Sequence, residues 1–258
     1  ARLKDANVLC VPTVGALKHA IKAVELGADI ITIQGSEGGG HTGEVPTSIL
    51  LNQVLDAVSV PVLAAGGYSN GRGLAATLTA GASGIAMGTR FMMTTDSPTP
   101  ETTLAEYVNV RDPSQVKVSW AVDGMRHRMI NNPFIQRFEK KSGLGRLLTA
   151  LQSAWTWKSA TDMTTSHMLK LLWQGIKEDP GAVSQLVMAA NQPVLLQHSM
   201  VDGRPNQGIL PSGQVAAAID NLPSVAQLIN DIIAEATVRF TELSRRLNES
   251  EDISSQSK

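Results

Sequence analysis

The sequence predicts an α/β fold, the C-terminal half of a (β/α)8 barrel of about four β/α units with a helical, lid-like region after it. Short apolar runs without polar alternation recur in the first hundred residues, which is typical of parallel strands covered on both faces. Helical patterns separate these runs, as in consecutive βαβ units. Glycine motifs follow two of the runs, where β/α barrels commonly bind phosphate.

The strands and helices of this first part alternate regularly. The expected strands are residues 7–14, 28–34, 61–65 and 84–87. The expected helices are residues 15–26, 47–58 and 70–80. Each helix carries apolar residues at helical spacing, and Gly27 and Gly81 are typical residues to end the first and the third. Parallel strands joined by single helices follow from this order.

The alternation stops near residue 95, and the rest of the chain reads differently. One short strand is expected at 116–122, and a helical region at 133–190. We expect residues 1–100 to form the second half of a cofactor-binding barrel and 101–205 a mainly helical substrate lid. We also expect C-terminal helices over 206–247, broken near Leu222 and Pro223, and a disordered tail rich in Ser, Glu and Asp over 248–258.

The composition is that of an ordinary globular protein. Of the 258 residues, 43% are hydrophobic and 17% are charged, with a formal net charge of -1. A nearly neutral chain argues against nucleic acid or an anionic membrane surface as the partner. The single cysteine, Cys10, cannot form an internal disulfide, which predicts a reducing, cytoplasmic location. No apolar run approaches the length of about 18 residues that a membrane span needs.

Two glycine motifs predict a phosphate site. The strand at 61–65 ends in Ala65-Gly66-Gly67, and the strand at 84–87 is followed by Gly88-Thr89. Exposed N–H groups at such strand ends form an anion nest. Phosphate in β/α barrels commonly sits after strands 7 and 8, so the strands at 61–65 and 84–87 are expected to be strands 7 and 8 of such a barrel. The strands at 7–14 and 28–34 would then be strands 5 and 6, and strands 1–4 are expected outside this chain, which begins without Met. The alternative is that these glycines only permit tight turns.

A third glycine-rich loop surrounds one histidine. Residues 31–43 run from an apolar strand into a loop that contains His41. Glycine lets the backbone approach a ligand closely, and histidine exchanges protons near neutral pH. The alternative is a flexible surface loop with an incidental histidine. Glu37 and Glu44 are expected to stabilise this loop or to face solvent, and no metal site is expected. His127, flanked by Arg126 and Arg128, is expected to be exposed, whereas His19, His167 and His198 are expected to be surface or packing residues.

Three motifs together resemble the nitronate monooxygenase family of FMN-dependent β/α-barrel enzymes. They are residues 34–43, with Gly38-Gly39-Gly40-His41-Thr42-Gly43; residues 64–73, with Gly66-Gly67 and Gly71-Arg72-Gly73; and Ala86-Met87-Gly88-Thr89-Arg90-Phe91. The similarity continues through Val122-Asp123-Gly124-Met125 and residues 208–214.

The resemblance implies FMN as the cofactor and His41 as the base toward the carbon next to a nitro group. It implies that a set of strand-end residues binds the cofactor: Gln34, Gly39, Ala65, Gly66, Gly67, Gly88 and Thr89. Thr13 aligns with a position where some members place a flavin-contacting Lys, so this contact differs here. Many members follow the histidine with Arg or Pro, where this chain has Thr42.

The expected function is therefore oxidation of nitronates, nitroalkanes or a related acidic-carbon substrate, with O2 or another electron acceptor. One alternative is a flavin-dependent reductase or dehydrogenase of a CoA or ACP thioester, because residues 185–196 and 208–216 look most like enzymes of steroid-ring breakdown. A flavin-binding remnant without turnover is a non-enzymatic alternative. A phosphosugar isomerase is disfavoured, because no strand-end carboxylate or lysine stands in the expected place. The oligomeric state stays open, a homodimer included.

Overall fold

A computed structural model describes residues 2–160 and 188–256, together with positions 164, 166, 170, 173 and 177. The chain forms two compact units, which are described separately. The first unit comprises Ala1–Gly38, Gly43–Ser97 and Ala218–Lys258, and the second comprises Gly39–Thr42 and Pro98–Ala217. Much of the region predicted to be helical over 133–190 lies outside the described residues.

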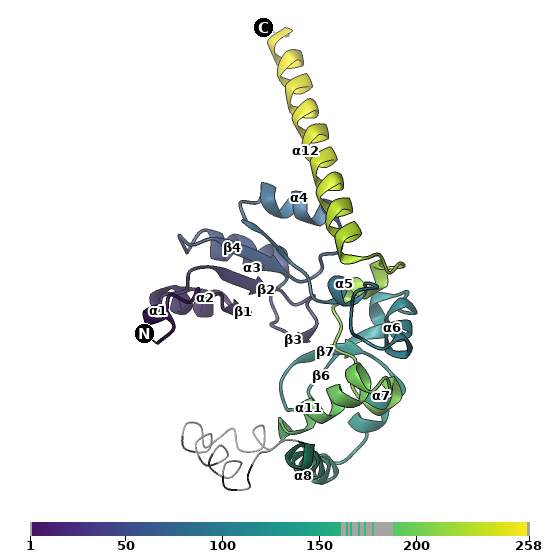
Figure 1. Ribbon diagram of the computed structural model, residues 1–258. Helices are drawn as coiled ribbons and strands as arrows, with labels where there is room; N and C mark the ends of the chain where they lie inside the picture. Colours follow the sequence, from purple (N-terminus) through teal and green to yellow (C-terminus); the bar gives the residue numbers. More distant parts are fainter. Residues whose placement is uncertain are drawn as a thin grey trace. The chain divides into compact units, whose positions relative to one another are not determined.

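The first unit contains a four-stranded parallel sheet (Figure 1). Its strands, in the order β1-β2-β4-β5, are β1 (Thr13–Val14), β2 (Ile31–Gln34), β4 (Val62–Ala65) and β5 (Gly84–Ala86). The helices between them are α2 (Leu17–Glu25), α3 (Thr47–Leu55) and α4 (Gly71–Thr79), with the short α1 (Arg2–Asp5) and α5 (Thr89–Met92) at either end. The predicted α/β fold with a parallel sheet is confirmed.

One strand is much shorter than expected. The sequence predicts a strand over residues 7–14, but β1 contains only Thr13 and Val14. The preceding apolar residues Val8, Leu9 and Val11 are exposed. The apolar run alone therefore overpredicted the length of this strand.

The core of the first unit lies between the sheet and its helices. Ile31 and Ile33 of β2 and Leu50 and Val54 of α3 are all fully buried. Burying a side chain of this size contributes about 1.5–3 kcal/mol. Thr32, on the opposite face of β2, is buried as well, so β2 is covered on both faces, as expected for a parallel strand.

The long helix α12 (Val225–Gln256) lies beside α4 in the first unit (Figure 1). Leu228, Ile232 and Ala236 are buried, and the Glu235 carboxylate accepts a hydrogen bond from the Gly71 N–H at 2.8 Å. A Cβ on Gly71 would lie 2.4 Å from the Ile232 carbonyl oxygen, so the close approach requires glycine. The structure describes residues 248–256 as the end of this helix, where the sequence predicts disorder.

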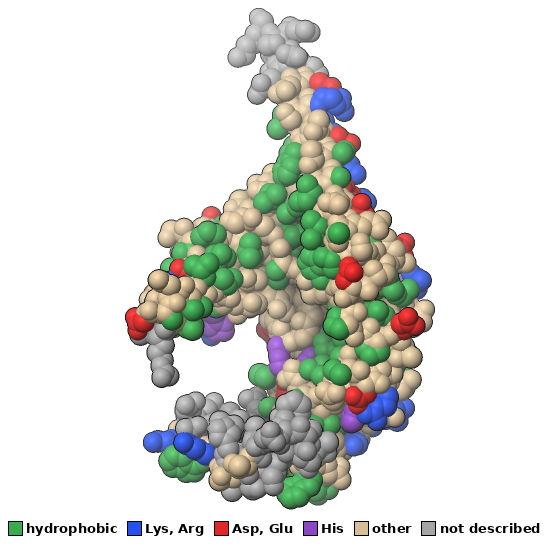
Figure 2. Space-filling view, in the orientation of Figure 1, with side chains coloured by type: hydrophobic (Ala, Val, Ile, Leu, Met, Phe, Trp, Pro, Cys, Tyr) green, Lys and Arg blue, Asp and Glu red, His purple; other side chains and the backbone are tan. Residues whose placement is uncertain are grey.

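Hydrophobic side chains are also exposed along α12 (Figure 2). They are Ile229, Ile233, Val238, Phe240, Leu243 and Leu247.

The second unit contains a three-stranded antiparallel sheet, in the order β3-β7-β6. The strands are β3 (Gly40–His41), β6 (Val116–Ser119) and β7 (His127–Ile130). Its longer helices are α6 (Glu101–Val108), α7 (Pro133–Glu139), α8 (Gly143–Ala160) and α11 (Asn191–Leu196). Shorter helical turns are η1 (Pro113–Gln115), η3 (Gln197–Val201), η4 (Pro205–Gln207) and η5 (Gln214–Ala218).

The sequence predicts one strand in the second unit and misses two. Residues 116–122 were expected to form a strand, and β6 covers their first part. The fully buried β7 reads His-Arg-Met-Ile, a polar start without alternation, and β3 has only two residues. Their pairing joins residues far apart in the chain, His41 with His127, which local patterns do not reveal.

Among the described helices, none has the length and apolar character required to cross a membrane.

Candidate functional site

The first unit brings the ends of three strands to one edge of its sheet. The register pairs Gln34 of β2 with Ala65 of β4, and Ala65 with Ala86 of β5. The loops that follow these residues therefore leave the sheet at the same level. This edge is where open and closed α/β sheets bind their ligands.

Two glycines of this edge have backbones that other residues rarely adopt. Gly66 has φ +111° and Gly67 has φ +81°, a region that favours glycine. A Cβ on Gly66 would also lie 2.8 Å from Thr47 Oγ1. At Gly88, a Cβ would have no described heavy atom within 4 Å. The edge thus combines a crowded turn after β4 with open space after β5.

The glycine loop after β2 is fixed by Glu37. Its carboxylate accepts hydrogen bonds from the Thr47 N–H at 3.0 Å and from Thr47 Oγ1 at 2.7 Å. Thr47 begins α3, so the negative charge also lies at a helix N-terminus, where it is stabilising. Thr47 Oγ1 lies 3.3 Å from the Gly66 carbonyl oxygen. Glu37 thus stabilises the loop, one of the two roles expected for it.

The residues that the sequence predicts to bind the cofactor lie in different parts of the structure. Gln34, Ala65, Gly66, Gly67, Gly88 and Thr89 lie at or directly after the ends of β2, β4 and β5. Thr13 pairs with Thr32, two residues before Gln34, and is exposed. Thr13 is thus the last residue but one of β1, one position before the end of that strand. Gly39 and His41 belong to the second unit.

In the second unit, His41 contacts a buried carboxylate. His41 Nε2 lies 2.5 Å from Asp123 Oδ2, and the side chain of Asp123 has no exposed area whereas that of His41 is 39% exposed. Asp123 Oδ1 accepts a hydrogen bond from the Met125 N–H at 3.0 Å. An ionised carboxylate can only accept, so Nε2 donates the proton of this contact. Such a pair fixes both the orientation and the tautomer of the imidazole.

A second histidine lies beside this pair. His127 of β7 is directly opposite His41 of β3, and the two ring centroids are 4.8 Å apart. His127 is only 1% exposed, and neither ring nitrogen has a hydrogen-bond partner within the described part of the chain. Burial lowers the pKa of His127 to about 4, with a smaller contribution from His41. His127 is therefore uncharged at neutral pH.

The expectation that His127 is exposed is wrong. The flanking Arg126 and Arg128 indicated a solvated segment, but β7 pairs with β3 on one side and with β6 on the other. The Arg126 guanidinium lies over the Trp120 ring at 5.4 Å, and Arg128 is itself buried. Charged neighbours thus did not keep this histidine at the surface.

Asp123 is the residue that sequence reasoning missed. The stretch Val122–Met125 contributed to the family resemblance, but no role was assigned to its carboxylate. The sequence does contain a signal, because an Asp between the apolar Val122 and a glycine is typical of a turn. In the structure Val122 is buried and Gly124 has φ +79°, so the turn lies at the edge of a core. Its contact with His41, 82 residues away, was not accessible to local patterns.

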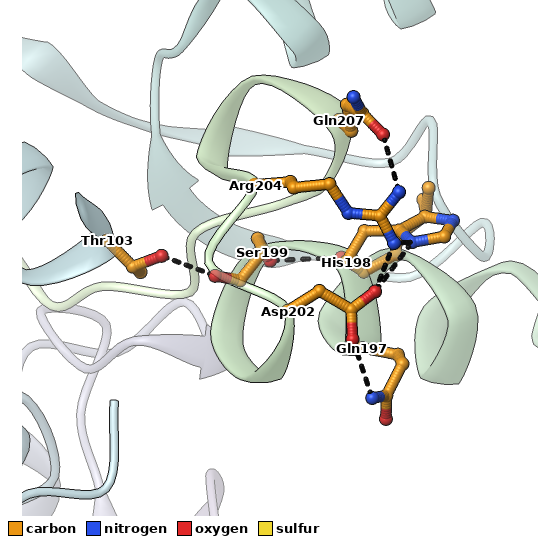
Figure 3. Close-up of polar contacts among 8 residues, drawn as sticks. Thr103, Gln197, His198, Ser199, Asp202, Arg204 and Gln207 are labelled. Atoms are coloured by element: carbon orange, nitrogen blue, oxygen red, sulfur yellow. Dashed lines mark hydrogen bonds and ion pairs between the residues drawn. The ribbon is translucent and has the colours of Figure 1, made fainter. Parts of the chain in front are cut away.

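The second unit has another His–Asp contact, which is exposed (Figure 3). His198 Nδ1 lies 3.3 Å from Asp202 Oδ2, and Asp202 also accepts from Arg204 and from Gln197 Nε2 at 2.9 Å. The hydrogen bond from Arg204 is the largest cause that lowers the pKa of Asp202 to about 2. Nearby, Thr103 Oγ1 donates to the Ser199 carbonyl. These contacts stabilise a turn, in keeping with the packing or surface role expected for His198.

Comparison with known proteins identifies the family. The nitronate monooxygenase family model matches residues 1–235. The chain is 44% identical over 243 residues to (3aS,4S,5R,7aS)-5-hydroxy-7a-methyl-1-oxo-octahydro-1H-indene-4-carboxyl-CoA dehydrogenase of Rhodococcus jostii, which covers 94% of this chain and 69% of that protein. It is 38% identical over 152 residues to a probable nitronate monooxygenase of Staphylococcus aureus, covering 55% of this chain and 42% of the relative.

A solved structure is also similar to this chain over most of its length. FabK from Thermotoga maritima matches with a TM-score of 0.71 and 26% identity, over 95% of this chain and 66% of FabK. The chain thus spans about two thirds of the length of FabK and of the dehydrogenase. On the match to the family model over residues 1–235, the chain belongs to the nitronate monooxygenase family.

Proposed function

We propose that this chain is part of an FMN-dependent oxidoreductase that acts on a CoA thioester, with His41 as its base. The contact between His41 and the buried Asp123 carboxylate carries the catalytic part of this proposal. The thioester is favoured because the similarity to the CoA dehydrogenase extends over 94% of the chain, whereas that to the probable nitronate monooxygenase extends over 55%. This reverses the order in which the sequence alone ranked the two substrates.

The strand-end loops of the first unit fit a flavin phosphate. Gly66 and Gly67 leave β4 with positive φ values, and a Cβ on Gly88 would have no described heavy atom within 4 Å. These glycines, with Ala65 and Thr89, would hold the phosphate through backbone N–H groups, as at other anion nests. Gln34, at the end of the neighbouring strand, and Gly39 would contact the ring system. FMN bound there would supply a two-electron acceptor.

His41 would take the substrate proton at Nδ1. Because Nε2 donates to Asp123, the neutral ring carries its basic lone pair on Nδ1. Proton uptake makes the ring cationic, and the Asp123 carboxylate at 2.5 Å stabilises that charge. Asp123 is therefore a positioning residue that acts through His41. A proton on a carbon activated by a thioester, or on a neighbouring hydroxyl, is the type that such a base removes.

The parallel sheet of the first unit is proposed to be one half of a (β/α)8 barrel. An open sheet of this kind exposes unpaired edges, and closing it into a barrel removes them. We propose residues 1–100 as the second half of the barrel, 101–205 as a substrate lid and 206–247 as the helices that close it. The partner strands would come from polypeptide outside these residues.

Anaerobic flavin reduction tests the proposed function. The full-length protein, purified with excess FMN, should absorb at roughly 450 nm and lose this absorbance when substrate is added. We expect faster bleaching with the indene-carboxyl-CoA thioester named for the Rhodococcus relative than with a nitroalkane. A colourless protein, or a flavin that neither compound reduces, would contradict the proposal.

Nitronate oxidation is the second candidate. It is supported by the family model over residues 1–235 and by the similarity to the probable nitronate monooxygenase. Oxygen consumption with a nitronate, and no reaction with the thioester, would favour it.

A further inference from the structure

His41, Asp123 and His127 form a cluster, but the proposed proton transfer uses only His41 and Asp123. His127 is left without a role. One ligand atom from each of these residues lies within 4.8 Å of the other two. All three residues belong to the second unit. We propose that they bind a divalent transition-metal ion such as Zn²⁺, although the sequence alone gave no indication of a metal site.

The backbone arranges two of the ligands in advance. His41 and His127 are directly opposite each other in the antiparallel pair β3 and β7. Directly opposed side chains of an antiparallel pair stand on the same face of the sheet. Asp123 reaches the same place from the turn that precedes β7, and Met125 N–H holds its other oxygen at 3.0 Å. A metal ion would thus meet three side chains that the backbone already brings together, and small side-chain shifts would complete the coordination.

His127 provides the independent evidence for a ligand. It is 1% exposed, yet both ring nitrogens lack a hydrogen-bond partner in the described part of the chain. Buried polar atoms normally have partners, and an unpartnered one is destabilising. A metal ion bound to one of these nitrogens would provide the missing interaction.

The donor set selects the class of metal. Two imidazoles and one carboxylate suit Zn²⁺ and related transition ions, whereas Ca²⁺ and Mg²⁺ prefer oxygen ligands alone. Tetrahedral Zn²⁺ with bonds of about 2.0–2.2 Å places its ligand atoms roughly 3.4 Å apart. His41 Nε2 and Asp123 Oδ2 are closer than this, at 2.5 Å, so the ion would displace the proton between them and the two atoms would move roughly 0.9 Å apart. Three protein ligands leave a fourth position open to water or substrate.

Metal binding would inhibit the proposed enzyme. An uncharged imidazole that binds metal through Nε2 carries its hydrogen on Nδ1. His41 could then no longer accept the substrate proton at Nδ1. This consequence rests on the proposed function, but the metal site itself does not.

Calorimetric titration with Zn²⁺ alone tests the site. The full-length protein, stripped with a chelator and free of substrate, should bind one ion at this site. Removal of a residue that only orients a metal ligand costs about 10–100-fold in metal affinity. His127→Leu removes a ligand itself, so it should weaken Zn²⁺ binding by roughly 100-fold or more. His198→Gln is the matched control, because His198 lies in the same unit beside a carboxylate, and it should bind as the wild type does. Equal affinity of His127→Leu and wild type, or no binding by wild type, would overturn the site.

A second measurement does not depend on a variant that folds. In proton NMR of the wild type, Zn²⁺ should shift the ring signals of His41 and His127 and leave those of His198 unchanged. Shifts confined to His198 would also overturn the site. Turnover is measured separately, with and without Zn²⁺: binding without any flavin reduction would contradict the proposed function alone, and reduction without binding would contradict the metal site alone.

Discussion

The two His–Asp contacts of the second unit use the same side chains in different surroundings. At His41, the carboxylate of Asp123 is fully buried and the imidazole is partly exposed. At His198, both side chains are about equally exposed, near 30%, and Asp202 also accepts from Arg204. A carboxylate that is already paired with a guanidinium in water has little effect left on a histidine.

Burial of the carboxylate indicates which of the two contacts can support proton transfer. Removal from water strengthens the interaction between Asp123 and a cationic His41, and the exposed part of the ring can still reach a substrate. The Asp202 cluster instead fixes a turn, since the residues that contact Asp202 are Gln197, His198 and Arg204 of one short segment. A His–Asp contact therefore becomes informative only together with the burial of its carboxylate.

The largest effect is expected from His41→Asn. Loss of a general base costs about 10²–10⁴-fold in rate, and we expect anaerobic flavin reduction to slow by a factor in this range. FMN should remain bound, because the proposed phosphate loops lie in the first unit. Stopped-flow absorbance measures the rate, and the ratio of flavin to protein is the control. An unchanged rate would remove His41 from the mechanism.

Asp123→Asn should have a smaller effect on the same reaction. The amide keeps the shape of the side chain but removes the charge that stabilises cationic His41, and loss of such an outer-shell partner typically costs about 10–100-fold. We expect the loss in kcat, with KM nearly unchanged, because Asp123 acts through His41. Asp123→Glu should restore part of the rate. A change in KM alone would instead indicate a role in substrate binding.

Much of the first unit could be predicted from the sequence, for a physical reason. Strands β2, β4 and β5 and helices α2, α3 and α4 lie inside or within a few residues of the expected ranges. The strands are short apolar runs and the helices carry apolar residues at helical spacing, and neighbouring residues suffice to reveal both patterns. The strand at 7–14 failed because an apolar run does not show whether anything covers it, and Leu9 is 70% exposed.

The site could be predicted only in part. Glycine motifs at strand ends and a histidine in a glycine loop are local signals, and they led to Gly66, Gly88 and His41. The environment of His41 depends on pairing between residues 40–41 and 127–128 and on Asp123. These contacts form only in the folded second unit. Buried polar clusters are therefore the features that one sequence reveals least.

The two clusters should also differ in the pH range where each affects stability. The pKa of His127 is about 4 in the folded chain, whereas an ordinary histidine has a pKa of 6.5. The unfolded chain thus binds more protons in this range, and the stability present above pH 6.5 is lost as the pH falls toward 4. At pH 5 we expect a loss of about 2 kcal/mol relative to pH 7, since one pKa unit corresponds to about 1.4 kcal/mol. Urea unfolding at both pH values measures it. His127→Leu should lose less, and an equal loss in both proteins would contradict the assignment.

The smallest effect is expected from Asp202→Asn. The pKa of Asp202 is lowered to about 2, mainly by Arg204, so its contribution is present above about pH 4 and is lost only as the pH falls toward 2. At neutral pH the variant should reduce flavin at the wild-type rate, because the exposed cluster of Figure 3 holds a turn and no reacting group. The free energies of unfolding of the wild type and of Asp202→Asn should become more alike as the pH falls below 4. If Asp202→Asn slowed flavin reduction as much as Asp123→Asn, burial of the carboxylate would not be the property that distinguishes a catalytic histidine from a structural one.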